Sequence, residues 1–274
     1  MNILFLGDVV GKPGREALAK YLPRLKRRLK LDFIVVNGEN AAHGIGITAD
    51  ICHEFFDMGG HCITTGNHIW DQREIISFID KDNRLLRPAN LPVDAPGQGS
   101  VIVENEKGQK LGVINVMTQL FMKPIDTPYK PLENALAEMR LKDNVDAILV
   151  DVHGEATSEK MGIGLFCNGY ASLVVGTHTH IPTADTRILD GGTAFQSDAG
   201  MCGCYDSVIG MDKDVMLHRM ATQLPGERMR PAEGEGGVCG IFVQVNDETG
   251  LADVAAPVRM GPFLSETVPE IDAA

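Results

Sequence analysis

Short runs of apolar residues recur along the chain, and each is closed by glycine or by a polar side chain. The runs lie at residues 2–6, 32–36, 61–64, 146–150 and 173–177. A short apolar run bounded by turn residues is typical of a buried strand. The pattern therefore predicts a series of buried strands separated by longer segments.

Apolar residues at helical spacing lie in the segments between these runs. One leucine series has spacings of four, three and four positions, at Leu18, Leu22, Leu25 and Leu29. It predicts a helix over residues 15–30 with one apolar face, which Pro23 should kink or split. Further helices are expected at residues 48–58, 72–80, 157–167 and 215–223, and from Pro131 onward. Asp71 with Glu74 three positions later resembles a capping box for the helix at 72–80.

Two segments predict antiparallel strands in addition to this alternation of strands and helices. Residues 100–104 and 110–116 flank a turn at Lys107-Gly108 and predict a β-hairpin. Beyond residue 180 several short β-prone runs predict a second, more antiparallel sheet. No linker composition interrupts the chain, so we expect one α/β domain over residues 1–274 with mixed sheets.

Composition and charge narrow the class of protein. The formal net charge of −12 disfavours a broad nucleic-acid-binding surface or an anionic-membrane surface. No apolar run approaches the ~20 residues of a membrane span, and the N-terminus does not resemble a signal peptide. The six cysteines lack the spacing of a disulfide scaffold or a zinc finger. We expect a cytoplasmic protein, and self-association remains compatible with the sequence.

Metal-capable side chains follow the ends of the predicted strands. They are Asp8, Glu39, Asn67, His153 and the pair His178 and His180. In an open α/β sheet the carboxyl ends of the strands form the edge at which ligands bind. Extended backbone after residue 177 would aim both histidines of the His-Thr-His segment the same way. Core packing does not require such a set of side chains, so the sequence predicts a metal site at this edge.

The donor types indicate which metals and which chemistry to expect. Carboxylate, amide and imidazole donors without thiolate suit manganese, iron or zinc. Six or seven ligands exceed one open catalytic site and suit two ions that share a bridging carboxylate. Two ions ~3.5–4 Å apart can activate water and stabilise in-line displacement at phosphorus. The sequence therefore predicts hydrolysis of a phosphate ester with two transition-metal ions, iron or manganese first and zinc as the alternative.

These blocks occur in the order found in a known family. Gly7-Asp8, Asn37-Gly38-Glu39-Asn40, Gly66-Asn67-His68, His153-Gly154 and Gly176-Thr177-His178-Thr179-His180 together resemble the calcineurin-like metallophosphoesterase family. They look most like its YmdB-like bacterial branch, and the resemblance spans nearly the whole chain. It implies a four-layer α/β/β/α sandwich of two mixed sheets with a dinuclear site at the strand ends.

The resemblance also implies a role for each residue. The first ion would be held by Asp8, Glu39, Asn40 and His180, and the second by Glu39, Asn67, His153 and His178. Where most of the superfamily has Asp-x-His, this chain has Asp8-Val9-Val10, and Glu39 replaces the usual bridging aspartate. Asn40 would take the place of the lost imidazole, or would instead orient Glu39 or the substrate.

His68 would be the general acid that protonates the leaving oxygen. It is not needed as a metal ligand, and a spare histidine beside two ions favours an enzyme. Its side chain could instead pack against the helix start at Trp70. The expected function is a metal-dependent phosphodiesterase acting on small phosphodiesters, by resemblance cyclic nucleotides and particularly 2′,3′-cyclic ones. A phosphomonoesterase or protein phosphatase of the same fold is one alternative. A metal-binding regulatory protein with weak turnover is another.

Overall fold

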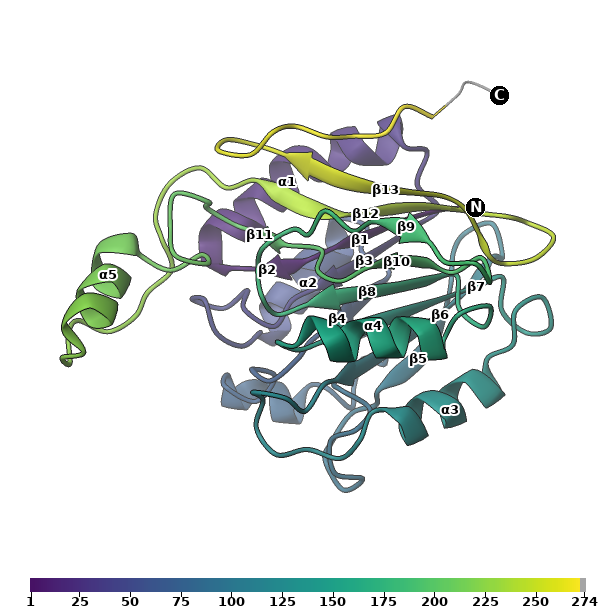
Figure 1. Ribbon diagram of the computed structural model, residues 1–274, viewed down its shortest axis with the longest axis horizontal. Helices are drawn as coiled ribbons and strands as arrows, with labels where there is room; N and C mark the ends of the chain where they lie inside the picture. The colour runs from purple at the N-terminus through teal and green to yellow at the C-terminus, as the bar shows by residue number, and fades with distance from the viewer. Residues whose placement is uncertain (272–274) are drawn as a thin grey trace.

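The computed structural model describes residues 1–271, and two large mixed β-sheets dominate this part of the chain (Figure 1). The first has the strand order β13-β12-β1-β3-β4 and the second the order β5-β6-β7-β8-β10-β9. The first sheet consists of β1 (Asn2–Leu6), β3 (Phe33–Asn37), β4 (Cys62–Thr64), β12 (Val238–Val245) and β13 (Ala252–Met260). The second consists of β5 (Ser100–Glu104), β6 (Lys110–Met117), β7 (Ala147–His153), β8 (Leu173–Thr177), β9 (Arg187–Ile188) and β10 (Ala194–Gln196). A short parallel pair joins β2 (Asp8–Val9) to β11 (Met201–Cys202).

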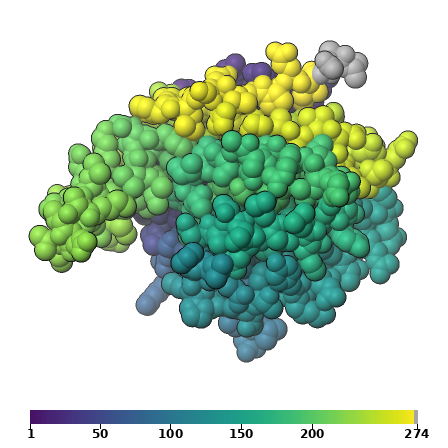
Figure 2. Space-filling view, viewed as in Figure 1, coloured from purple at the N-terminus to yellow at the C-terminus, as the bar shows by residue number. Residues whose placement is uncertain are grey.

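The described part of the chain has five α-helices and one 3₁₀ helix, and all but the fifth α-helix pack on the outer faces of the sheets. They are α1 (Gly11–Arg28), α2 (Ala49–Asp57), α3 (Tyr129–Glu138), α4 (Thr157–Phe166) and α5 (Lys213–Thr222), with a 3₁₀ helix η1 (Arg73–Ser77). The segment with α5 stands out from the body of the molecule (Figures 1 and 2). Within residues 1–271 no helix is both long and apolar enough to cross a membrane.

Alternation along the strands explains how the layers pack. In β1, Ile3 and Phe5 face the second sheet and pack with residues of β7 and β8. Leu4 and Leu6 point to the opposite face, where they pack with the predicted leucine series of α1. The outer face of the second sheet packs in the same way against α3 and α4.

The pairing of the central strands determines at which edge of the sheets the predicted site residues lie. β1, β3 and β4 are parallel neighbours in the first sheet, and β6, β7 and β8 are parallel neighbours in the second. Parallel strands present their carboxyl ends at one edge of a sheet. The loops that follow β1, β3, β4, β7 and β8 therefore carry the predicted site residues.

The mixed α/β class and the hairpin of β5 and β6 are confirmed. The helix at residues 48–58 is confirmed as α2, where the Thr48 hydroxyl caps the helix by accepting from the Ile51 amide. The leucine helix is also confirmed, but it begins at Gly11 and continues through Pro23 without being split. The helices at 157–167 and 215–223 correspond to α4 and α5.

Two expectations are wrong. The strands beyond residue 180 do not form a sheet of their own, because β9 and β10 complete the second sheet and β12 pairs with β1. Both faces of β12 are apolar, so this strand has to lie in a sheet whose two faces are both buried. The helix at 72–80 is only the short η1, and it starts without a side-chain cap. The Asp71 carboxylate accepts a hydrogen bond from the His68 ring instead.

Candidate metal centre

All the predicted site residues lie at carboxyl ends of central strands. Asp8 follows β1, and Glu39 and Asn40 form the turn after β3. Asn67 and His68 form the turn after β4. The second sheet contributes His153 as the last residue of β7, and His178 and His180 in the loop after β8. The two sheets therefore supply opposite sides of one site.

Four of these side chains converge on one point. His153 Nε2 lies 3.1 Å from Glu39 Oε1, 2.9 Å from Asn67 Oδ1 and 3.1 Å from His178 Nδ1. Donor atoms of Glu39, His153 and His178 all lie within 4.8 Å of one another. Glu39 and His153 are fully buried. This is the set predicted for the second ion.

The remaining three side chains lie beside Glu39. His180 Nε2 is 3.8 Å from Asp8 Oδ1 and 3.2 Å from the Asn40 amide nitrogen. The same amide nitrogen donates to Glu39 Oε1 at 3.2 Å. Glu39 thus contacts both groups, as a bridging carboxylate would. Asn40 presents its nitrogen here, so its oxygen would serve as a ligand only with the amide turned over.

Each of the three imidazoles turns one nitrogen into the site and the other to an oxygen. His180 Nδ1 lies 2.7 Å from the Ile209 carbonyl, and His178 Nε2 lies 3.4 Å from Glu155 Oε2. The Ile209 carbonyl can only accept, so Nδ1 of His180 carries the hydrogen, and the nearby Glu155 carboxylate favours a hydrogen on Nε2 of His178. The inward nitrogens, Nε2 of His180 and Nδ1 of His178, then present lone pairs to the site.

The same argument applies to His153 through a short relay. The Thr177 hydroxyl donates to Asp151 Oδ1 at 2.7 Å, so it accepts from His153 Nδ1, which lies 2.9 Å away. When the ring is neutral, His153 Nε2 then faces the oxygens of Glu39 and Asn67 with its lone pair. An imidazole whose outer N–H is held by an oxygen is the usual arrangement for a metal ligand.

Acceptors gathered in this way require positive charge between them. Burial raises the pKa of Asp8, and its Oδ1 has no hydrogen-bond partner among residues 1–271. Burial lowers the pKa of His153, but the carboxylates of Glu39, Asp8 and Asp151 together raise it to about 9. Burial and the neighbouring His153 lower the pKa of His178 to about 3. One proton on His153 cannot interact with all of these acceptor atoms at once. Cations placed between them would, so this set of ligand atoms fits metal ions.

The structure separates the His68 ring from this cluster. Its backbone N–H donates to Glu39 Oε2 at 3.1 Å, while its ring Nδ1 lies 2.6 Å from Asp71 Oδ2. The side chain is 31 % exposed. Asp71 therefore orients the imidazole and leaves Nε2 available to a bound molecule. The sequence assigned Asp71 to a helix cap and missed this role.

The expectation of extended backbone at the His-Thr-His segment is wrong. β8 ends at Thr177, and His178 and His180 have φ values of 97° and 67°. These are left-handed values that residues with a Cβ seldom adopt. As a result the two rings approach different partners, His178 the side of His153 and His180 the side of Asp8.

Several residues around the site were not among the predicted site residues. Thr177 and Asp151 were strand residues, and Lys160 belonged to a helix. Asp198 stood in a segment that nothing in the sequence connected with certainty to the metal site. Spacing along the chain could not reveal them, because each contacts residues at least 17 positions away.

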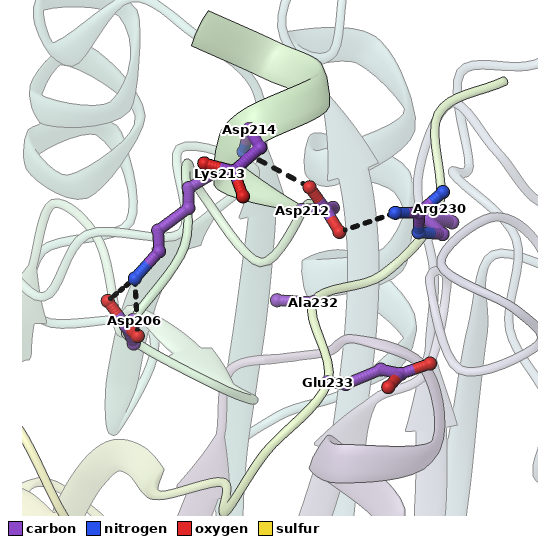
Figure 3. Close-up of a pocket in the computed structure, with 7 residues that line it drawn as sticks. All are labelled: Asp206, Asp212, Lys213, Asp214, Arg230, Ala232 and Glu233. Carbon is purple, nitrogen blue, oxygen red and sulfur yellow. Dashed lines mark hydrogen bonds and ion pairs between the residues drawn. The ribbon is translucent and has the colours of Figure 1, made fainter. Parts of the chain in front are cut away.

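A hollow at the start of α5 has a different character (Figure 3). None of the predicted site residues lines it. Lys213 pairs there with Asp206 at 2.7 Å, and Arg230 pairs with Asp212 at 3.0 Å. Asp212 also caps α5 by accepting from the Asp214 amide. These charges satisfy one another, and we assign no chemistry to the hollow.

Comparison with known proteins identifies the family and similar structures. Residues 4–258 match the family described as YmdB-like protein. The chain is 45 % identical over 252 residues to a 2′,3′-cyclic-nucleotide 2′-phosphodiesterase of Bacillus subtilis (strain 168), covering 92 % of this chain and 94 % of the relative. A structure of a hypothetical protein from Thermus thermophilus superposes with a TM-score of 0.87 at 35 % identity, covering 95 % of this chain and 99 % of the other. A structure of a novel phosphatase from Mycoplasma pneumoniae gives a TM-score of 0.85 at 32 % identity, covering 95 % and 93 %.

Proposed function

This chain belongs to the YmdB-like protein family, and from that premise we propose that it is a dinuclear metal-dependent phosphodiesterase acting on 2′,3′-cyclic nucleotides. The substrate class is supported by the name of the Bacillus subtilis relative. The chemistry is supported by one observation above all: one nitrogen of each of three imidazoles and the buried carboxylates of Asp8 and Glu39 face one another in one site.

The residues divide between two ions that share Glu39. Asp8, Asn40 and His180 would hold the first ion, and Asn67, His153 and His178 the second. Oxygen and imidazole donors suit iron or manganese, with zinc as the alternative. Bound ions would polarise the phosphoryl oxygens and lower the pKa of water. Asn40 would be a ligand with its amide turned over, and in its present orientation it steadies Glu39.

His68 would supply the proton that the leaving oxygen needs. Asp71 holds the ring through Nδ1, so Nε2 is the nitrogen that can reach a substrate. The His68 backbone N–H holds Glu39 Oε2, which connects the acid to the bridging carboxylate. The order of helices and sheets described above is, in this proposal, the four-layer α/β/β/α sandwich of metallophosphoesterases.

A comparison of substrates tests this function. Protein reconstituted with Mn²⁺ or Fe²⁺ would be assayed with 2′,3′- and 3′,5′-cyclic nucleotides, bis-nitrophenyl phosphate and nitrophenyl phosphate. We expect the 2′,3′-cyclic nucleotides to have the highest kcat/KM. The Glu39→Ala variant, prepared identically, controls for contaminating phosphatases. Faster turnover of the monoester would favour a phosphomonoesterase, and no turnover with either ion would favour a metal-binding regulatory protein.

A further inference from the structure

A buried ion pair lies behind the metal centre and takes no part in the function proposed so far. Lys160 in α4 and Asp198 after β10 have side chains that are 0 % and 1 % exposed, with Nζ 2.8 Å from Oδ2. Removing two charges from water costs free energy that their attraction often fails to recover. A stabilising role alone is therefore a weak explanation for this pair.

The pair contacts the backbone on both sides of His178. Lys160 Nζ donates to the carbonyl oxygen of Thr177 at 2.7 Å. Asp198 Oδ2 accepts from the amide of Thr179 at 3.1 Å. Gly176 leaves the room that Lys160 needs, because a Cβ there would stand 2.8 Å from Lys160 Cδ. The cation and the anion thus hold the two residues that flank one predicted ligand.

The segment held in this way has a strained backbone. His178 and His180 both have left-handed φ values, which persist in residues with a Cβ only where surrounding contacts impose them. The turn directs His178 toward Glu39 and His153, and His180 toward Asp8. An extended backbone would not separate the two rings in this manner.

The same carboxylate also reaches the loop of Asp8. Asp198 Oδ1 accepts from the amide of Gly200 at 2.9 Å. Gly200 packs directly on Gly7, where a Cβ would overlap the Gly200 carbonyl. Gly7 precedes Asp8, whose Oδ2 in turn accepts from the His178 amide at 3.1 Å. One buried carboxylate is therefore connected to the ligand loops of both sheets.

We propose that Lys160 and Asp198 are positioning residues that impose the left-handed His178–His180 turn and thereby set the affinity for both metal ions. This inference rests on the proposed function, since it concerns the same site. Neither residue contacts the reacting atoms. Their effect should appear in metal binding even where the fold remains intact.

A double variant separates positioning from stability. In Lys160→Met or Asp198→Leu one buried charge loses its partner, so both single variants should melt at lower temperature. In Lys160→Met/Asp198→Leu no charge is left unpaired, and the melting temperature should recover. Mn²⁺ affinity, measured by chelator competition on the metal-free protein, should remain weakened at least tenfold, because no side chain then holds Thr177 and Thr179.

The exposed pair of Lys213 and Asp206 provides the matched control. Its side chains are 49 % and 51 % exposed, and Lys213→Met/Asp206→Leu should change neither the melting temperature nor the Mn²⁺ affinity. Recovery of both quantities in the buried double variant would show a purely structural pair and overturn the inference. If that variant does not fold, Asp198→Asn decides, because its single oxygen cannot accept from both the Thr179 and the Gly200 amides as the two carboxylate oxygens do. Wild-type Mn²⁺ affinity in folded Asp198→Asn overturns the inference, and a weakened affinity supports it.

The two proposals fail in distinguishable ways. Wild-type protein that binds neither Mn²⁺ nor Fe²⁺ overturns the proposed function, and this inference with it. Wild-type protein that binds Mn²⁺, together with variants that bind it equally well, overturns only the positioning role of Lys160 and Asp198.

Discussion

At the scale of single residues, Glu39 contacts side chains from both halves of the site. Its Oε1 lies 3.1 Å from His153 Nε2 and accepts from Asn40, and its Oε2 accepts from the His68 amide. Burial raises the pKa of Glu39, but the adjacent His153 together with His68 lowers it to about 2. The group is thus a carboxylate at neutral pH and can neutralise cations on either side.

Glu39→Ala should therefore cost the protein both ions, whereas wild type should contain about two transition-metal ions per chain, as two-ion phosphoesterases do. Elemental analysis of protein purified in parallel measures this. The exposed Glu133→Ala, in a helix far from the site in sequence, serves as the control and should retain the wild-type content. One ion in wild type, or a fully loaded Glu39→Ala, would contradict the shared-carboxylate arrangement.

His68 should affect the rate and leave the metal content unchanged. Its ring contacts Asp71 and makes no hydrogen bond to the metal-site side chains within residues 1–271. A positioned general acid contributes ~10²–10⁴-fold to the rate. His68→Ala should lose roughly that factor in kcat with a ribose leaving group and much less with nitrophenolate, which departs unprotonated. Asp71→Asn should show the same leaving-group dependence with a smaller loss, because it disturbs only the orientation of the ring.

Equal impairment of His68→Ala on both leaving groups would assign His68 to charge stabilisation at phosphate. Loss of an ion from His68→Ala would contradict its separation from the ligand set. Metal analysis and the two assays on the same preparation distinguish these outcomes.

The sequence could predict the ligand candidates because each follows a strand end, where the fold brings side chains together. It could not predict Asp71, which matched a helix-cap pattern equally well. Lys160 was hidden for a different reason: a lysine in a helix is normally exposed, and its burial depends on Gly176 and Asp198 arriving from other elements. Positions fixed by tertiary contact leave no periodic signal.

At the scale of elements, the turns after the strands must let side chains approach very closely. Gly66 lies between β4 and Asn67, and a Cβ at this position would overlap both His153 Nε2 and Glu39 Oε2. The glycine is required here for space, since its φ lies outside the left-handed range. The backbone of one sheet thus lies directly against ligands from the other.

Gly66→Ala should therefore fold but lose most of its Mn²⁺ affinity, because Glu39 and His153 must move apart. Gly203→Ala is a suitable control: its Cβ would meet Val10 Cβ at an ordinary 3.4 Å. Chelator competition with Mn²⁺ on both variants measures the difference. Unchanged affinity in Gly66→Ala would mean that the site relaxes freely and that its present packing does not determine metal binding.

The errors in the predicted elements have a common physical cause. The segment at 72–80 had helical signals, yet Asp71 bonds to His68 and only η1 forms. The strands after residue 180 had the right local pattern, yet their partners lie far away in sequence, as β12 pairs with β1 through Ile3 and Val243. Local patterns determine the type of an element, whereas pairing depends on which sheet has an open edge.

At the scale of the whole molecule, the candidate metal centre lies at one edge of two sheets that meet mainly through apolar side chains, with buried polar contacts such as that of Asn37 with Asp151 between them. Asp8, Glu39 and Asn67 follow strands of the first sheet, and His153 and His178 belong to the second. Without cations, buried acceptors from the two sheets face one another across this edge. Ions bound between them should therefore hold the carboxyl ends of both sheets together.

Removal of the ions should consequently destabilise the molecule as a whole. A ligand present at 100 times its Kd stabilises the native state by ~2.7 kcal/mol, and in a chain of this size each kcal/mol corresponds to ~2–4 °C in Tm. Chelation should thus lower Tm by about 5–10 °C, and added Mn²⁺ should restore it. In Glu39→Ala the Tm should respond to neither treatment.

Hydrogen exchange can show whether the ions act across both sheets. After chelation, amide exchange should accelerate together in the loops that follow β3 and β4 of the first sheet and β7 and β8 of the second, while the apolar interior between the sheets keeps its protection. Joint acceleration follows from ligands contributed by both sides. Faster exchange confined to the loops of one sheet would mean that the ions bind to that sheet alone, and the site would then not be the connection between the two halves of the fold.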